Sequence, residues 1–572
     1  MMVKSHWSML SQLALVCALT LSFFALRAAY EVSPIHAASG TAVGTSLTDY
    51  PRVIRLAHSN NSSLPNGTLI ASADTNNGQA FPVYTSINGG SSWNYLSTVS
   101  PADASAGNCC VALFEVPQQT GSLSAGTLLL AGTIGTGLSI GIWYSTDQGN
   151  SWNFLSYVAT GGQGSGKGLW EPDLAIDNNG NLICYFSDER HQGDGYNQLL
   201  GHVISTDGGQ TWGSEVYDVA VNDNNTRPGM ASVVKLPDGS YIMAYEVCGN
   251  PGCSVHVRTS SDGDNWGNAS NLGSIPQASD GSYFTSTTGL VWSPGGGPNG
   301  ELILVGKYLS NSPNGGSGST LLTTTDFSGT GTWYKMTAPF NVNIPNSGDH
   351  CANYSSSLLP SSDGSSLLEL AGQLTADNNC QIVAGSANAG VLPYNDPFSS
   401  GTDAGWVTYG GNWSVSNGVY SDTSYSGQGD KAVVGSTAWS NYTLSGDVQL
   451  TANDDDAGFI VRVTDPSTGI DALSGYVVGI SSGGFYLGRE SNGSWTTLGS
   501  GTIPGGVSTY TWYHLNIGVQ GCTLSIAASA AGSSDQGTLN YTDNGCSSTT
   551  GQIGIRTHSG TASWRNISVT AQ

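Results

Sequence analysis

The stretch that decides the fold of this chain is Ser205-Thr206-Asp207-Gly208-Gly209-Gln210-Thr211-Trp212. Near copies run from Ser145 to Trp152 and from Ser86 to Trp93, and two degenerate copies end in tryptophan further along. The five closing tryptophans are spaced 59, 60, 54 and 67 residues apart. A motif that recurs at such an interval indicates one supersecondary unit repeated along the chain.

Each copy has the composition of a hairpin turn. Asp bonds its own backbone, Gly adopts positive φ, and Trp buries a large face against the sheet. The pattern resembles the Asp box, S-x-D-x-G-x-[ST]-W, of the sialidase-like or BNR-repeat β-propellers. In those propellers the box lies on turns away from the active centre, so it indicates fold and not function. Of the degenerate copies, Thr259–Trp266 has Ser261 at the Asp position, and Thr324–Trp333 has two extra residues.

Six similar hairpins, each an apolar strand, a polar or Gly turn and a second apolar strand, interleave with these motifs between residues 39 and 393. Six units of about 60 residues predict a six-bladed β-propeller. The hairpins are Arg52–Asp74, Val111–Thr133, Leu174–Ser187, Ser232–Glu246, Leu290–Tyr308 and Ser355–Gln373.

The pattern changes after Tyr394-Asn-Asp-Pro-Phe398, where the repeated motif stops. Short alternating strands such as Tyr442–Leu450 and Gly458–Val463 resemble a concanavalin-like, laminin-G-type jelly roll over 394–572. We expect this all-β domain to bind sugar, with a spacer that stabilises the propeller as the alternative. Asp454, Asp455 and Asp456 form a solvated turn in our interpretation, and calcium binding stays open.

The composition fits a turn-rich all-β protein: Gly is 79 of 572 residues, about twice the typical ~7%, and only 10% of residues are charged. The net charge of −24 argues against nucleic acid and anionic membranes as partners. No phosphate loop or other cofactor motif is present, so we expect no cofactor and no metal. A monomer that acts on a plant-type polysaccharide or oligosaccharide is expected.

The N-terminus predicts export. Lys4 precedes a largely apolar run from Met9 to Leu26, and small residues follow, so 1–38 is interpreted as a signal peptide and leader of a secreted, extracellular protein. A membrane anchor is the alternative interpretation, and no later stretch could span a bilayer.

The chain has ten cysteines, and three close pairs look like disulfides in an oxidising compartment. Zinc is the rival interpretation, but neither CxxC nor HExxH is present. Cys109, Cys110 and Cys184 stay unassigned. The predicted pairs are Cys248/Cys253, Cys351/Cys380 and Cys522/Cys546.

The scarce charges gather on one predicted rim of the propeller. The inner strand of each blade runs along the central channel and the second strand returns, so starts of first strands and ends of second strands share a rim. Carboxylates with aromatic and polar neighbours suit a sugar. These positions include Tyr50, Asp74, Glu171, Asp188, Glu189, Arg190, Glu246, Lys307, Tyr308 and Tyr354.

Glu171 and Glu246 are the candidate catalytic pair. Glycoside hydrolysis needs one protonated and one ionised carboxyl group, about 5–5.5 Å apart for retention. Apolar neighbours in Trp170-Glu171-Pro172-Asp173 and in the strand before Glu246 would shift their pKa values. A solvated surface carboxylate is the alternative for each. The expected substrate-binding residues are Trp170, Arg190, Tyr308, Tyr354, Arg55, Asp74 and Asp188.

The start Tyr50-Pro-Arg-Val-Ile-Arg-Leu56, with Trp170-Glu171-Pro172 in blade 3 and Ala244-Tyr245-Glu246 in blade 4, resembles glycoside hydrolase family 93 over about residues 45 to 390. That family contains exo-α-1,5-L-arabinanases, which release arabinobiose from the non-reducing end of linear arabinan with retention. The resemblance implies that Glu171 is the nucleophile and Glu246 the acid/base. It implies substrate contacts for Tyr354 and Arg190 by position.

Two other functions compete. A sialidase would need three arginines around a carboxylate, a Tyr nucleophile activated by Glu, and an Asp acid/base. Arg52 or Arg55, Arg190 and Arg227 are available, but blade 5 offers Lys307 instead of an arginine. A non-catalytic sugar-binding propeller is the other alternative, and it would keep binding sugar after both glutamates are replaced.

Overall fold

The computed structural model describes residues 40–572, except 103–106, 163, 250–251, 297–298, 313–314, 346–349, 389, 391, 426–428, 453–455 and 547. The expected signal peptide therefore lies wholly outside the described residues. Asp454 and Asp455 of the acidic run also lie outside them. In the described part of the chain, the only helix is the short 3-10 turn Gln192–Asp194. No helix there has the length and apolarity to cross a membrane.

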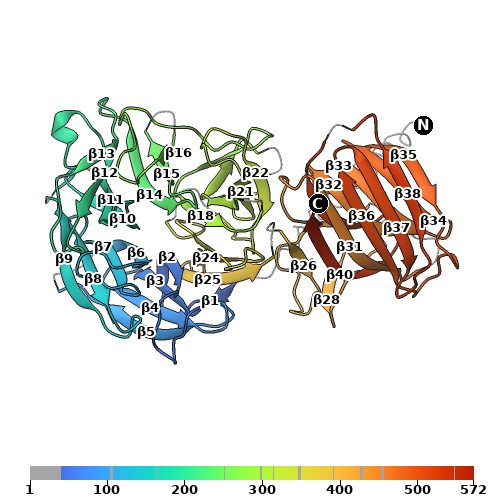
Figure 1. The fold of residues 1–572 in the computed structure, drawn as a ribbon, viewed down its shortest axis with the longest axis horizontal. Coiled ribbons are helices and arrows are strands. Elements are labelled where there is room, and N and C mark those ends of the chain that lie inside the picture. Colours follow the sequence, from blue (N-terminus) through green and yellow to red (C-terminus); the bar gives the residue numbers. More distant parts are fainter. Residues whose placement is uncertain are drawn as a thin grey trace, which may run out of the picture.

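The predicted propeller is confirmed, with six antiparallel sheets arranged around a centre (Figure 1). The first three blades are regular four-stranded sheets whose strands follow chain order from the inside outward. They comprise β2 (Thr48–Arg55), β3 (Leu69–Thr75), β4 (Phe81–Ser86) and β5 (Asn94–Val99); β6 (Cys109–Glu115), β7 (Leu128–Ile134), β8 (Ser139–Ser145) and β9 (Asn153–Thr160); and β10 (Leu169–Ile176), β11 (Leu182–Asp188), β12 (Leu199–Ser205) and β13 (Val216–Val219).

The last three blades depart from this regular order. Blade 4 gains β20 as a fifth strand from later in the chain, and blade 6 takes its outer strand, β1, from the N-terminal side, which closes the ring. They comprise β14 (Arg227–Lys235), β15 (Tyr241–Cys248), β16 (Ser254–Ser260), β17 (Tyr283–Thr285) and β20 (Tyr308–Ser310); β18 (Gly289–Ser293), β19 (Glu301–Val305), β21 (Thr320–Thr324) and β22 (Tyr334–Thr337); and β23 (Ser357–Pro360), β24 (Leu367–Leu374), β25 (Cys380–Ala387) and β1 (Thr41–Ala42).

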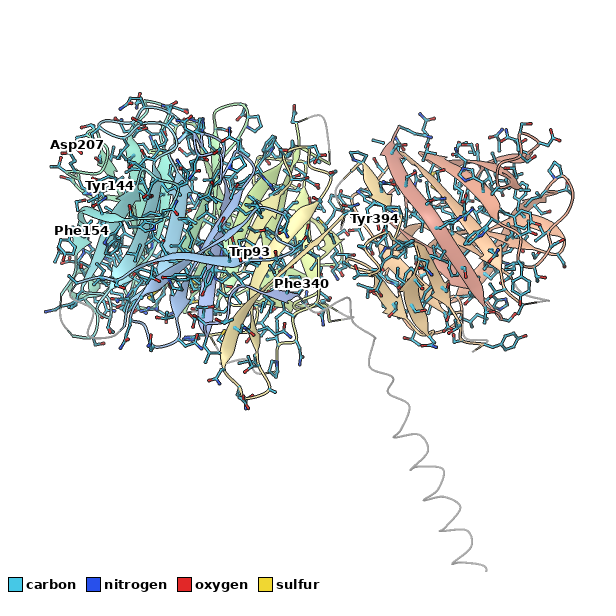
Figure 2. The ribbon with its side chains drawn as sticks, turned by 90° about the horizontal axis from the view of Figure 1, so that it is seen from below. Trp93, Tyr144, Phe154, Asp207, Phe340 and Tyr394 are labelled. Carbon is cyan, nitrogen blue, oxygen red and sulfur yellow. A yellow bond between two sulfur atoms is a disulfide. The ribbon has the colours of Figure 1, made fainter. Side chains whose placement is uncertain are left out.

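The repeated octapeptides form compact turns after the third strand of a blade. Asp207 Oδ1 accepts the N–H groups of Gln210 and Thr211 at 2.9 and 3.0 Å, and the N–H of Gly209 donates to Ser205 Oγ. Because the third strand runs parallel to the inner strand, these turns lie at the rim opposite the inner-strand starts. Figure 2 labels Asp207 on the side of the propeller remote from the C-terminal domain.

The expectation that Ser261 replaces the Asp in the fourth copy is wrong. Asp262 accepts the Ser260 hydroxyl at 3.0 Å and the Asn265 N–H at 2.8 Å, as Asp207 does in its own turn. The Trp266 indole N–H donates to the Gly263 carbonyl. One residue is missing after the Asp, so an ungapped alignment shifts the motif by one position.

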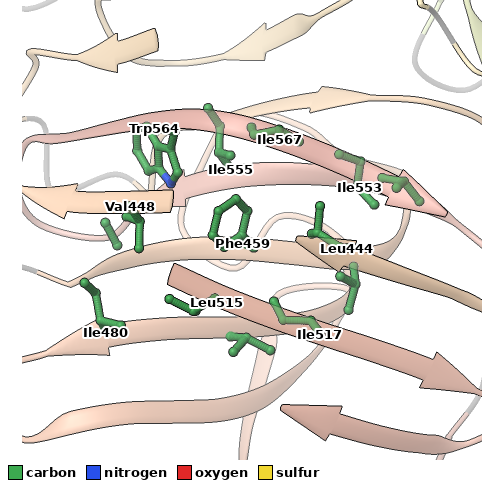
Figure 3. Packing of buried hydrophobic residues seen from close by; sticks show 14 of the residues in the cluster. Leu444, Val448, Phe459, Ile480, Leu515, Ile517, Ile553, Ile555, Trp564 and Ile567 are labelled. Carbon is green, nitrogen blue, oxygen red and sulfur yellow. The ribbon is translucent and has the colours of Figure 1, made fainter. Parts of the chain in front are cut away.

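The C-terminal domain is a β-sandwich of two antiparallel sheets. Its apolar core lies between the sheets and is built from inward-facing residues of both, such as Phe459, Leu515 and Trp564 (Figure 3). One sheet comprises β26 (Tyr394–Asp396), β28 (Trp413–Ser416), β29 (Val419–Asp422), β40 (Ala562–Ala571), β31 (Tyr442–Leu450), β36 (Tyr513–Gln520), β37 (Thr523–Ala530) and β38 (Gly537–Thr542). The other comprises β27 (Val407–Tyr409), β30 (Lys431–Val434), β39 (Gln552–Thr557), β32 (Ala457–Thr464), β33 (Ser474–Ser481), β34 (Gly484–Ser491) and β35 (Ser494–Gly501).

The sandwich docks against the outer strand of blade 5. Met336 of β22 forms an antiparallel bridge with Ser436, and the Thr437 N–H donates to the Lys335 carbonyl at 2.8 Å. The Gln552 amide donates to the Thr337 hydroxyl at 3.0 Å, and the Trp439 indole donates to the Gly390 carbonyl at 3.1 Å. The edge of blade 5 is therefore covered by the second domain, which lies beside β21 and β22 in Figure 1.

The three predicted cysteine pairs are confirmed as disulfides. Cys109 and Cys110, which the sequence left unassigned, form a fourth disulfide between neighbouring residues at the start of β6. Cys184 is a buried free thiol in β11.

Candidate active site

A β-bulge interrupts the inner strand of blades 1 to 4 at the same place, and a residue of the same left-handed conformation precedes the inner strand of blades 5 and 6. One residue there has a φ between 53° and 65°, and regular pairing or the next inner strand resumes two residues later. Non-glycine residues rarely adopt this left-handed conformation, and such bulges turn a side chain out of the ladder. Glu171 thus lies at a break in the ladder between β10 and β11. The six residues are Tyr50, Cys110, Glu171, Met230, Thr287 and Ser355.

Glu171 is held by two hydrogen-bond donors. Its Oε2 accepts the Ser187 hydroxyl at 2.7 Å and the backbone N–H of Met230, in the next blade, at 3.0 Å. Burial raises the pKa of Glu171, and these two bonds and the positive charge of Arg227 oppose the rise. The donors favour the ionised carboxylate.

Glu246 has fewer stabilising contacts for its charged form. Its Oε2 accepts the backbone N–H of Thr287, in blade 5, at 2.7 Å. Burial, with the negative charge of Glu171 as a second cause, raises the pKa of Glu246 to about 7. This group therefore keeps its proton at pH values below about 7.

Gly229 brings the two carboxyl groups together. It pairs directly with Glu246 between β14 and β15, where opposite residues lie about 4.5–5.5 Å apart. A Cβ on Gly229 would lie 3.3 Å from Glu171 Oε2 and 2.6 Å from the Gln198 amide nitrogen. Only glycine leaves room at this position for the Glu171 carboxylate to approach the Glu246 strand.

Arg227 and Tyr354 complete the surroundings of the pair. The Arg227 guanidinium donates to Glu189 Oε1 at 2.8 Å and to the side-chain Oε1 of Gln198 at 2.7 Å, and its charge acts on both Glu171 and Glu246. Burial raises the pKa of Tyr354, and the charges of both glutamates add to it. The Tyr354 hydroxyl is therefore a neutral donor close to both carboxylates.

Tyr354 is itself fixed by its neighbours. The His350 ring stacks on it with centroids 4.9 Å apart, and Lys307 Nζ lies 5.3 Å from its ring centre. Tyr308 lies beside the same lysine, at 5.2 Å. Tyr308 begins β20, which extends the sheet of blade 4 and not, as expected, the second strand of blade 5.

Asp74 has a structural role next to the site. It is 4% exposed, and its carboxylate accepts the backbone N–H groups of Cys110 and Val111 at the bulge of blade 2. Burial and its register partner Asp49 raise the pKa of Asp74 well above the usual range. No contact links Asp74 to Glu171 or Glu246 among the described residues.

Asp188 and Arg190 lie one position beyond Ser187 and Glu189, in a cluster of their own. Asp188 is fully buried, and the Arg190 guanidinium donates to it at 2.6 Å and to Glu215 at 2.8 Å. Asp188, His191 and Glu215 also have the spacing of metal ligands, but Arg190 already donates hydrogen bonds to both carboxylates. Among the described residues a second such group is Glu246 with Cys248 and Cys253, whose sulfurs are joined in a disulfide.

Arg55 lies apart from the pair. It ends β2 and donates to the Pro360 carbonyl at 3.0 Å, five residues from Tyr50, or about 17 Å along an extended strand. The arginines that a sialidase would need also point to separate partners, since Arg52 donates to Ser355 while Arg190 and Arg227 each bind carboxylates. They do not converge on one anion.

Three residues of the site were not predicted from the sequence. Ser187 lies near the end of the second strand of blade 3, and Gly229 and Met230 lie near the start of the first strand of blade 4, so all three occupy rim positions. Their residue types gave no signal, because neither a serine, a glycine nor a methionine suggests acid–base chemistry. Trp170, an expected substrate-binding residue, precedes Glu171 and lines a cavity between blades 2 and 3.

Three solved structures are similar to the propeller. The α-L-arabinofuranosidase Arb93A of Fusarium graminearum has 26% identity and a TM-score of 0.51, covering 61% of this chain and 98% of that enzyme. The GH93 α-L-arabinofuranosidase of the same fungus with arabinobiose has 25% identity and a TM-score of 0.51, covering 62% and 98%. The Penicillium chrysogenum α-L-arabinanase complexed with arabinobiose has 30% identity and a TM-score of 0.50, covering 62% and 98%.

The C-terminal sandwich matches a family model described as a 3-keto-alpha-glucoside-1,2-lyase-like domain over residues 397–570. No curated protein matches the sequence. Through its propeller, which covers nearly the whole of the Penicillium arabinanase at 30% identity, this chain belongs to the GH93 family of glycoside hydrolases.

Proposed function

We propose that this protein is a secreted, retaining exo-arabinanase that releases arabinobiose from linear α-1,5-L-arabinan. The observation that carries the proposal is the pairing of Glu171 and Glu246 across Gly229, with different hydrogen bonding at the two carboxyl groups. One group is poised to stay ionised and the other to keep a proton, which is the division of labour that retention requires.

In the first step Glu246 donates its proton to the glycosidic oxygen while Glu171 attacks the anomeric carbon. The bond to the leaving chain breaks, and a covalent glycosyl–Glu171 ester forms. In the second step the Glu246 carboxylate takes a proton from water, the water oxygen attacks the anomeric carbon, and Glu171 leaves as a carboxylate. The Tyr354 hydroxyl and the Arg227 guanidinium stabilise the carboxylate charges during both steps.

The sugar is proposed from the relatives, two of which are described in complex with arabinobiose. The domain division follows the chain: residues 39–393 as the catalytic unit and 394–572 as an accessory sugar-binding domain. Residues 1–38 are proposed as the export signal, and N-terminal sequencing of the secreted protein would test this.

Product analysis on debranched linear arabinan tests the reaction. The parent should release arabinobiose from the first minutes, and the Glu171→Gln variant should release none. Proton NMR of the fresh product should show the α-anomer first, as retention demands. Glu115→Gln is the matched control and should keep parent activity. In the parent, the Glu115 carboxylate accepts the backbone N–H groups of Ala57 and His58.

Two results would contradict the proposal. Initial β-anomer would exclude retention, and a ladder of mixed oligosaccharides would exclude the exo mode. Arabinobiose release that survives Glu171→Gln would remove this residue from the mechanism.

A further inference from the structure

A cavity of about 490 Å³ lies at the junction of blades 2 and 3, on the same rim as Glu171. Trp170 and Glu189 line it from blade 3, Gly135, Thr136 and Leu138 line it from blade 2, and the loop before β10 contributes the rest. This volume is within the range of about 300–1,000 Å³ that small-molecule sites occupy.

Glycines keep the cavity open. Half of its ten lining residues are glycine, so backbone amides and not side chains form much of the wall. At Gly164 a Cβ would meet nothing within 4 Å, and therefore a side chain there would project into free space. Such a wall offers hydrogen-bonding groups without filling the volume. The five are Gly135, Gly162, Gly164, Gly166 and Gly168.

Trp170 is placed as a flat surface beside this space. A Cβ on Gly168 would lie 2.4 Å from the indole nitrogen, and one on Gly137 would lie 2.9 Å from Cζ2 of the ring. The indole is therefore packed closely against glycine backbone, which only glycine permits. Indole rings held in this way stack on the apolar faces of sugars.

Glu189 connects the cavity to the catalytic pair. Its carboxylate accepts the Arg227 guanidinium at 2.8 Å, and its charge acts on Glu171. Its backbone N–H donates to Gly168 at 3.0 Å, in the cavity loop. Because this charge is already paired with Arg227, the cavity suits a neutral, hydroxyl-bearing ligand.

We propose that the cavity is a binding subsite for one further pentose unit of the substrate chain, on the leaving-group side and beyond the unit next to the cleaved bond, with Trp170 as its stacking surface. The proposal rests on the proposed function. It makes the enzyme's efficiency depend on substrate length through a residue that takes no part in proton transfer.

Two variants address the cavity from opposite sides. Trp170→Ala removes the stacking surface, and Ser165→Trp fills the space from the loop. Lys167→Trp adds the same ring to the same loop at an exposed position outside the lining, and it is the matched control. kcat and KM are measured on linear arabino-oligosaccharides of increasing length, beginning with the shortest that the parent cleaves.

Both cavity variants should lose about 10-fold in kcat/KM on the longer oligosaccharides, through KM, and should match the parent on the shortest one. Trp170→Phe should recover part of the loss. An equal loss at every length, or no loss at any length, overturns the proposal.

If the parent cleaves no arabino-oligosaccharide, the proposed function fails, and the subsite is then judged by binding alone. Calorimetric titration with the same oligosaccharides should show affinity that Ser165→Trp weakens and Lys167→Trp leaves unchanged. Equal affinity in both variants overturns the subsite, independently of catalysis.

Discussion

At the scale of single residues, the two glutamates differ in what donates to them. Glu171 receives a hydroxyl and a backbone N–H, whereas Glu246 receives one backbone N–H and faces the negative charge of Glu171. Hydrogen bonds to a carboxylate favour its ionised form, and a neighbouring negative charge disfavours it. This difference assigns the acid/base role to Glu246 in the proposed mechanism.

The pH dependence of the reaction follows from this difference. The pKa of Glu246 is raised to about 7, so the carboxyl is protonated below that pH and loses its proton above it. We expect kcat/KM on linear arabinan oligosaccharides to fall as pH rises through about 7, because the general acid is then ionised.

The Glu246→Gln variant tests whether Glu246 causes this fall in kcat/KM at alkaline pH, the alkaline limb of the profile. On an aryl arabinobioside, whose good leaving group needs no protonation, Glu246→Gln should show no alkaline limb. An alkaline limb that is unchanged in Glu246→Gln would show that another group is the acid.

Gly229 is predicted to be essential for activity and not for folding. In Gly229→Ala the added methyl group would press on Gln198 at 2.6 Å, on Ser187 at 3.2 Å and on Glu171 at 3.3 Å. Displacing the carboxylate by about 1 Å should lower kcat/KM about 100-fold, with little change in Tm. Gly193→Ala, where a Cβ meets nothing within 4 Å, should behave as the parent. Parent-like activity in Gly229→Ala would contradict the proposed packing of the pair.

At the scale of elements, the left-handed residues at the inner strands of the blades position the site. Side chains of one blade accept the N–H of the left-handed residue in the next blade: Asp74 takes that of Cys110, Glu171 that of Met230, and Glu246 that of Thr287. The same contacts therefore join neighbouring blades and orient both catalytic carboxyl groups. Replacing either glutamate also removes a contact between blades.

Strand β24 of blade 6 carries a buried acid that lowers stability at neutral pH. Glu369 is 1% exposed, and burial raises its pKa to about 8. Below the unfolded pKa of about 4.5 the carboxyl is protonated in both states, and no penalty exists. As pH rises toward 8 the unfolded state alone ionises, so the folded state loses about 1.4 kcal/mol per pH unit, or about 3 kcal/mol at pH 7.

Glu369→Gln is therefore predicted to stabilise the protein at pH 7 by up to about 3 kcal/mol, and by almost nothing at pH 4.5. Urea unfolding at the two pH values measures the difference. Asp377→Asn, at an exposed position just beyond the same strand, is the control and should show neither effect. An equal gain at both pH values would mean that the effect is not due to ionisation.

At the scale of the whole molecule, the two domains share a short stretch of paired backbone. Gly435 lies at its centre: its carbonyl accepts the Thr337 N–H at 3.2 Å and the Gln552 amide at 2.9 Å. Its φ is 103°, and a Cβ there would lie 2.4 Å from the Trp439 ring. This residue holds the loop that reaches blade 5.

Gly435→Ala is predicted to uncouple the domains. Scanning calorimetry should show a single transition for the parent and two separated transitions for the variant, since contacts across the junction would no longer link the two cores. Gly483→Ala, on a surface turn of the sandwich, should leave the parent profile unchanged. One unchanged transition in Gly435→Ala would show that the bridge at Met336 and Ser436 does not couple unfolding.

The sequence by itself determined the six blades, three disulfides and the two glutamates on one rim. These follow from local signals, because turn residues at fixed offsets, apolar runs and cysteine spacing act within one hairpin. Tertiary structure alone decided that Asp74 binds the bulge of blade 2, that Arg190 is bound by Asp188 and Glu215, and that Arg55 lies apart from the pair. It also decided that Gly229 sets the approach of Glu171 to Glu246. The reason is physical. Which donor meets which carboxylate depends on contacts between blades about 60 residues apart. It also depends on left-handed positions that six different residue types occupy.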